Sequence, residues 1–124
     1  MEIRNKVILV TGASEGIGKS AAVALAKEGA KVIIIFKSKE NLAQKVLEEC
    51  NKYSQMNMVF RADITNDNEV KKMFQEISKK YGSLDVLINN AGIFDESDNP
   101  DNLAAFANVF AVNFLGQVRV AKHA

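Results

Sequence analysis

The stretch Thr11-Gly12-Ala13-Ser14-Glu15-Gly16-Ile17-Gly18 decides the fold, because it joins an apolar run to a helical pattern. Residues 6–10 (KVILV) are mainly β-branched and aliphatic, which predicts a buried strand. Residues 17–28 have helical periodicity and end at Gly29, a residue that readily takes a left-handed cap. The predicted apolar face of this helix consists of Ile17, Ala21, Ala22, Leu25 and Ala26.

Three glycines give this strand-to-helix turn its chemical character. Gly12 permits a tight turn, Gly16 lets the backbone approach a pyrophosphate, and Gly18 lets the helix pack closely on the strand. A diphosphate would lie on the helix N-terminus, where free N–H groups and the macrodipole favour negative charge. A plain glycine-rich turn is the alternative, but the position inside a β-α-β unit favours nucleotide binding. The spacing differs from the Gly-x-x-x-x-Gly-Lys loop of kinases and ATPases.

Strands and helices alternate along the rest of the chain. Such alternation implies right-handed crossovers and an α/β fold with helices on both faces of a parallel sheet. We expect a single domain over residues 1–124 with strand order 3-2-1-4. Further strands are predicted at residues 31–36, 58–61 and 85–89, and further helices after Ser38, from a capping box of Asn66 and Glu69, and from Asn102 to the end.

The amino-acid composition argues against two classes of partner, nucleic acids and membranes. The apolar share of 48%, the charged share of 25% and the net charge of +1 are typical of a soluble globular protein and indicate neither nucleic acid nor a membrane surface. The longest apolar stretch, residues 103–120, contains Asn108, Asn113, Gln117 and Arg119, so we interpret it as a buried helix. The lone Cys50 on an apolar helix stripe predicts a half-buried thiol and suits the cytoplasm.

Metal binding is not expected from the spacing of His, Cys and carboxylate residues. The acidic residues Asp95, Glu96, Asp98 and Asp101 are interpreted as a hydrated surface loop. The single histidine, His123, lies at a helix end and is expected to cap that helix.

Four motifs in series resemble the short-chain dehydrogenase/reductase family. They are residues 11–18, Asp63 after the third strand, Asn89-Asn90-Ala91-Gly92 after the fourth, and Val112-Asn113 in the last helix. The resemblance implies the N-terminal half of a Rossmann-type, doubly wound sheet. It also implies an NAD(P)-dependent oxidoreductase that transfers hydride between nicotinamide and a carbonyl or alcohol substrate, with a 3-oxoacyl carrier-protein reductase as one guess.

The same resemblance assigns roles to individual residues. The residue at Asp63 contacts the adenine ring, residues 89–92 lie against the adenosine ribose and steady the sheet, and Asn113 belongs to a catalytic tetrad. Alternatively, Asp63 merely ends a strand and Asn113 bonds within its helix. A buried asparagine in an apolar helix must find polar partners. The full set of expected cofactor-binding residues is Gly12, Ser14, Glu15, Gly16, Ile17, Gly18, Lys37, Asp63, Ile64, Asn89, Asn90, Ala91 and Gly92.

The end of the second strand favours NADP over NAD. An acidic residue there would accept hydrogen bonds from the ribose hydroxyls and repel a 2′-phosphate, but this chain has Phe36 followed by Lys37 and Lys39. Glu15 acts in the opposite direction, because its carboxylate would face the phosphate. A solvated helix start is the alternative for the two lysines, so NAD stays open.

The catalytic Ser, Tyr and Lys of the family have no counterparts in the 124 residues. Tyr53 is followed four positions later by Asn57 and Tyr81 by Asp85, so neither begins Tyr-x-x-x-Lys and both are interpreted as structural. We expect the 124 residues alone to be inactive and the domain to be incomplete on its C-terminal side. A non-catalytic dinucleotide-binding module that docks a partner is the alternative. A methyltransferase is disfavoured, because such enzymes usually close the second strand with an acid where this chain has Phe36.

The last helix and the fourth strand both predict association. The helix has almost no polar face, so it must bury nearly all round. The fourth strand has the apolar sequence of a central strand, yet it would lie at the sheet edge. An open edge can pair with a strand of another chain. We therefore expect a homo-oligomer of the intact protein and self-association of these 124 residues.

Overall fold

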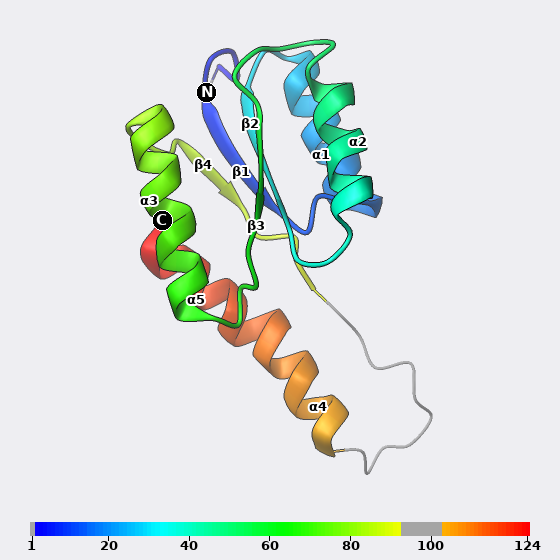
Figure 1. The fold of residues 1–124 in the computed structure, drawn as a ribbon, viewed down its shortest axis with the longest axis vertical. Coiled ribbons are helices and arrows are strands. Elements are labelled where there is room, and N and C mark those ends of the chain that lie inside the picture. Colours follow the sequence, from blue (N-terminus) through cyan, green and yellow to red (C-terminus); the bar gives the residue numbers. More distant parts are fainter. Residues whose placement is uncertain (1, 93–102) are drawn as a thin grey trace.

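A parallel four-stranded sheet forms the centre of the computed structural model, which describes residues 2–92 and 103–124 (Figure 1). The strand order β3-β2-β1-β4 confirms the predicted 3-2-1-4 arrangement. The predicted limits of β2 and β3 are confirmed, while β1 begins and ends one residue later than expected and β4 is shorter. The strands are β1 (Val7–Thr11), β2 (Lys31–Phe36), β3 (Met58–Arg61) and β4 (Val86–Ile88).

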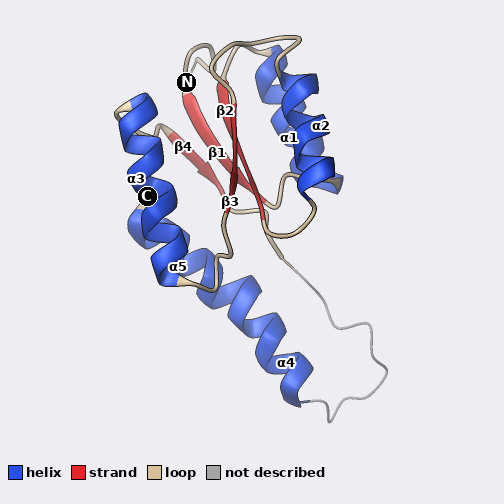
Figure 2. Cartoon of the chain, in the orientation of Figure 1, coloured by secondary structure: helices blue, strands red, loops and turns tan. Residues whose placement is uncertain are grey.

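Helices cover both faces of this sheet, as a doubly wound fold requires (Figure 2). Helices α1 (Gly16–Lys27) and α2 (Glu40–Cys50) lie on one face, and α3 (Asp67–Tyr81) and α5 (Gln117–His123) on the other. Before α5 the chain forms α4 (Leu103–Phe110) and a π-helical segment, η1 (Ala111–Gly116). The acidic residues 95–101 and Asn102, for which we predict a loop and a helix start, lie outside the described residues.

Alternating side chains of the strands build two separate cores. Ile8 and Ile34 face α1 and α2, whereas Leu9 and Ile33 face the α3 side. Because successive side chains of a strand point to opposite faces, a strand buried on both sides must be apolar throughout. Cys50 is completely buried rather than half-buried, and burial raises the pKa of its thiol to about 11.

The first and third helices depart from prediction at their N-terminal ends. Ile17 is 82% exposed, so the predicted apolar face is wrong there; it stands in the first turn of α1, and Val23 is buried further along. In α3, Asn66 Oδ1 accepts the expected bond from Glu69 N at 3.1 Å. The reciprocal bond of a capping box is missing, because Glu69 Oε1 accepts from Asp63 N at 3.3 Å instead.

The last helical stretch is much less buried than its composition predicts. It leaves the sheet along its length, with α4 extending away from the other helices (Figure 1). Gly116 and Val120 are buried, whereas Leu103 is 76% exposed and Phe114 56% exposed. The sheet ends at β4, and this stretch meets the core through Val112 of η1 and Val120 of α5. Along the described part of the chain, no helix has the length and apolar character needed to cross a membrane.

Candidate cofactor site

The turn between β1 and α1 leaves a helix N-terminus open. Gly12 and Gly16 have φ of +63° and +62°, values that side chains other than glycine's rarely allow. The N-cap residue Glu15 makes no side-chain capping bond, and the first turn of α1 holds no acidic residue. A Cβ added at Gly16 would meet no atom within 4 Å. Uncapped N–H groups beside open space form a cradle that fits an anionic group such as a diphosphate.

Close packing holds this turn in shape. A Cβ at Gly18 would lie 2.4 Å from the Gly12 carbonyl oxygen and 2.5 Å from Asn90 Nδ2. A Cβ at Gly12 would lie 2.8 Å from the Cα of Ala91. Both glycines are therefore required by contact with neighbouring backbone, whereas Gly16 faces open space.

The hydroxyl of Thr11 joins the turn to the loop after β4. Thr11 is completely buried, and its Oγ1 accepts from the main-chain N–H groups of Asn90 at 3.0 Å and Ala91 at 2.9 Å. The Asn90 side chain donates to the Gly12 carbonyl oxygen at 3.1 Å. Residues 90 and 91 thus brace the β1–α1 turn directly.

Two ion pairs flank the carboxyl end of β2. Lys37 Nζ lies 3.8 Å from Asp63 Oδ2, and Lys39 forms a short ion pair with Glu15. Three of the four side chains are exposed and Asp63 is half-buried, so each pair contributes little to stability. The Glu15 carboxylate, predicted to face a 2′-phosphate, is therefore paired with one of the two lysines predicted to bind that phosphate.

Asp63 lies in a tight turn after β3. Its Oδ1 accepts from Thr65 N at 2.9 Å and from Thr65 Oγ1 at 2.6 Å. Burial alone would raise the pKa of Asp63, but these hydrogen bonds and the nearby cations outweigh burial and hold its pKa below the usual value. The carboxylate is therefore kept ionised at the sheet edge where the other candidate residues lie. The next side chain, Ile64, is only 6% exposed.

Asn113 lies in η1 beside the loop after β4. A Cβ at Gly92 would lie 3.3 Å from Asn113 Oδ1. Asn113 is exposed, so the prediction of a buried asparagine is wrong; its neighbour Val112, and not Asn113, packs against the core. Asn89 donates from Nδ2 to the Gln117 carbonyl oxygen at 3.2 Å, and its buried Oδ1 has no hydrogen-bond partner among the described residues.

The expected residues thus gather at one edge of the sheet. The β1–α1 turn, Lys37, residues 63 and 64 and residues 89–92 all follow the carboxyl ends of parallel strands. Ser14 and Glu15 belong to the open turn, and the exposed Ile17 stands beside it. Ile64, by contrast, turns its side chain into the core.

Three residues that organise this edge were not predicted from sequence patterns. Thr11 stands in the quoted motif, but its two bonds to residues 90 and 91 span about eighty positions of sequence. Gln117 and Arg119 interrupt an apolar helix, and that interruption is the signal that could have pointed to them.

The remaining candidate side chains have structural contacts. The Nε2 atom of His123 lies 2.8 Å from Asp67 Oδ1, so this side chain joins α5 to α3 at the place where a helix cap was predicted. Tyr81 donates to the Met56 carbonyl oxygen at 2.6 Å, and burial raises the pKa of Tyr81 to about 12. No cluster of potential metal ligands occurs within residues 2–92 and 103–124.

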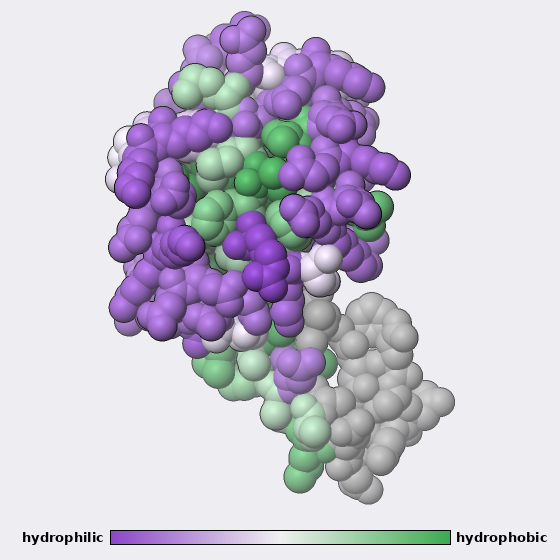
Figure 3. Space-filling view, in the orientation of Figure 1, coloured by the Kyte–Doolittle hydropathy of each residue, from purple (hydrophilic) through white to green (hydrophobic). Residues whose placement is uncertain are grey.

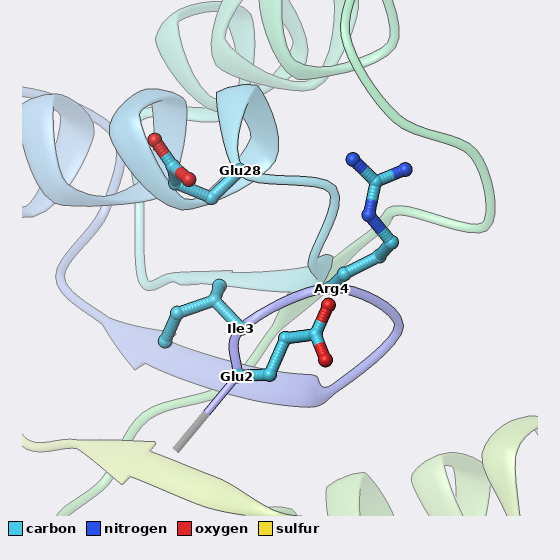
Figure 4. A pocket seen from close by; sticks show the side chains of 4 residues that line it. All are labelled: Glu2, Ile3, Arg4 and Glu28. Atoms are coloured by element: carbon cyan, nitrogen blue, oxygen red, sulfur yellow. The ribbon is translucent and has the colours of Figure 1, made fainter.

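A surface hollow at the opposite end of β1 is not part of this site. It is lined by Glu2, Ile3, Arg4 and Glu28, next to the C-terminal end of α1. Figure 4 shows that these side chains do not converge on a common point. The hollow therefore offers no arrangement of polar groups for a ligand.

Comparison with known proteins assigns the chain to a family. A hydroxynaphthalene reductase-like protein of Metarhizium guizhouense is 40% identical over 124 residues, which cover 98% of this chain and 46% of that protein. A 3-oxoacyl-[acyl-carrier-protein] reductase of Staphylococcus epidermidis is 43% identical over 89 residues, 72% of this chain and 36% of that protein. The chain spans less than half the length of these relatives. The family model for short chain dehydrogenase matches residues 6–124, and the chain therefore belongs to the short-chain dehydrogenase family.

Proposed function

We propose that this chain binds NADP at the carboxyl edge of its sheet, as the cofactor-binding part of a reductase. The observation that carries the proposal is the uncapped N-terminus of α1 beside open space at Gly16. The diphosphate would lie there, the adenosine toward Asp63, and the 2′-phosphate toward Lys37 and Lys39. When bound, a nicotinamide cofactor supplies or accepts hydride.

The substrate we propose is a small carbonyl compound or the corresponding alcohol. The two relatives described above are named as reductases, one of them of 3-oxoacyl groups on a carrier protein. A 3-oxoacyl group is our specific proposal. The exposed Asn113 amide beside Gly92 would hold a polar group or water at the reacting end of the cofactor. We place the whole protein in the cytoplasm.

A second candidate, a dinucleotide-binding module that docks a partner without catalysis, is favoured by the exposed apolar side chains of Phe110 and Phe114. Both candidates bind NADPH, so turnover by the whole protein, and not by these 124 residues, separates them. We expect the 124-residue polypeptide to bind the cofactor and to show no reductase activity on a 3-oxoacyl thioester. Measurable NADPH oxidation by the purified polypeptide would contradict this expectation.

Calorimetric titration tests the proposed ligand and its selectivity. NADPH should bind more tightly than NADH, and S-adenosylmethionine should not bind. E15Q should release Lys39 from its ion pair and strengthen NADPH binding roughly 2- to 5-fold, the worth of an exposed ion pair. K39M should weaken NADPH binding by a similar factor, and in both variants NADH binding should change less than NADPH binding.

The matched control for this selectivity is E40Q, which removes the carboxylate next to Lys39 in the chain. Because E40Q lowers the overall negative charge as E15Q does, it measures the general electrostatic effect. Equal gains in NADPH affinity for E15Q and E40Q would contradict the role given to the Glu15–Lys39 pair.

We propose, in addition, that the chain self-associates through the apolar surface of α4 and η1. Figure 3 shows apolar surface gathered at the α4 end of the molecule. Phe110 and Phe114 stack there with ring centroids 5.3 Å apart, and both are largely exposed. Sedimentation velocity should show dimers or larger species at micromolar concentration, with F114S shifting them toward monomer. If the wild-type chain sediments as a single monomeric species, the proposal of self-association is wrong.

A further inference from the structure

The junction between η1 and α5 contacts two cofactor-edge loops at once. Gln117 Nε2 donates to the Ala91 carbonyl oxygen at 2.9 Å, in the loop after β4. Arg119 Nη1 donates to the Ile64 carbonyl oxygen at 2.8 Å, in the loop after β3. These two side chains, Gln117 and Arg119, are called the tether below.

Packing against the loop after β3 reinforces the tether. A Cβ at Gly116 would lie 2.8 Å from Ile64 Cγ1, so this helix approaches Ile64 as closely as a residue without a side chain allows. The Arg119 side chain is 25% exposed, and its Nε lies 3.9 Å from Asp67 Oδ1. The same helical stretch therefore contacts Ile64 twice: Gly116 packs on its side chain, and Arg119 donates to its carbonyl oxygen.

The tether connects directly to the segment that carries Asn113. Gly116 is the last residue of η1 and Gln117 the first of α5, one turn beyond Asn113. A π-helical segment departs from regular α-helical hydrogen bonding, and such segments are frequent at functional sites. If cofactor binding moves either loop, the hydrogen bonds of Gln117 and Arg119 to the loop carbonyl oxygens would therefore transmit that movement to η1.

We propose that Gln117 and Arg119 are positioning residues that couple cofactor binding at the two loops to the placement of Asn113. This inference rests on the proposed function, because it requires NADP at the carboxyl edge. Neither side chain is assigned to contact the cofactor. Their part is to fix the loops after β3 and β4 relative to η1.

Amide hydrogen exchange with and without NADPH tests the coupling. In the wild-type chain, NADPH should slow exchange at residues 13–18 and, through the tether, at residues 116–123 by about 10-fold. R119M keeps the aliphatic stem but removes the donors. It should retain the slowing at residues 13–18, lose it at residues 116–123, and bind NADPH roughly 5-fold more weakly.

K122M is the matched control, since it removes a cation from an exposed position of the same helix. It should behave as wild type. If circular dichroism shows that R119M does not fold, R119K replaces it in the same experiment. R119K keeps the positive charge but lacks the planar set of guanidinium donors.

The outcomes separate the two proposals. If wild type binds no NADPH, the proposed function fails and the coupling falls with it. If wild type binds and the Arg119 variant transmits protection to residues 116–123 as fully as K122M, only the coupling is overturned.

Discussion

Replacing Gly18 with alanine is expected to destabilise the chain by about 3 kcal/mol and to abolish NADPH binding. The new Cβ would lie 2.4 Å from the Gly12 carbonyl oxygen and 2.5 Å from Asn90 Nδ2. Neither group can move without breaking the hydrogen bond that joins them, so the whole β1–α1 turn must shift. Urea unfolding followed by circular dichroism measures the loss of stability, and calorimetry measures the loss of binding.

G16A is the control that separates the fold from the ligand. A Cβ at Gly16 meets no neighbouring atom, so the cost to folding is the backbone strain of φ +62°, about 1–2 kcal/mol. That Cβ would nevertheless occupy the space proposed for the diphosphate, so NADPH binding should fall sharply. Equal destabilisation by G18A and G16A, or full NADPH binding by G16A, would refute this division.

The second large effect is expected for Thr11→Val, with a loss of about 3 kcal/mol in the free energy of unfolding. Valine fits the volume but leaves the N–H groups of Asn90 and Ala91 without their acceptor at a buried residue. An unpaired buried donor costs more than a hydrogen bond contributes on balance, and here two donors share one oxygen.

Thr11→Ser keeps the oxygen and removes only a methyl group, so its loss should be about 1 kcal/mol. Denaturant titration of both variants gives the comparison. If valine and serine at position 11 destabilise the chain equally, packing of the methyl group rather than the hydrogen bonds holds the two loops together.

Local patterns were sufficient to predict most of the fold. A strand buried on both faces needs apolar residues throughout, so the β2 run could be placed to the residue. Helix ends were harder: Ile17 fits the helical period but stands in the first turn of α1, where it is exposed. Helical periodicity predicts which residues lie on the same face of a helix, but it does not predict at which turn of the helix that face begins to contact the core.

The site was predictable where one short motif contains it. The glycines of the β1–α1 turn are such a case, because their spacing carries the backbone geometry. The bonds of Thr11, Gln117 and Arg119 join segments far apart in sequence, and no local pattern reports them. The exposure of Asn113 depends on which side of η1 faces the core, which composition alone cannot give.

The most direct test of the account is a titration of the ¹⁵N-labelled chain with NADPH, followed by amide chemical shifts. We predict the largest changes at residues 12–18, with smaller ones at residues 63–65 and 90–92, and none at the hollow of Glu2, Arg4 and Glu28. A spectrum unchanged at millimolar NADPH, or changes confined to residues away from the carboxyl edge, would contradict the claim that this edge is a dinucleotide site.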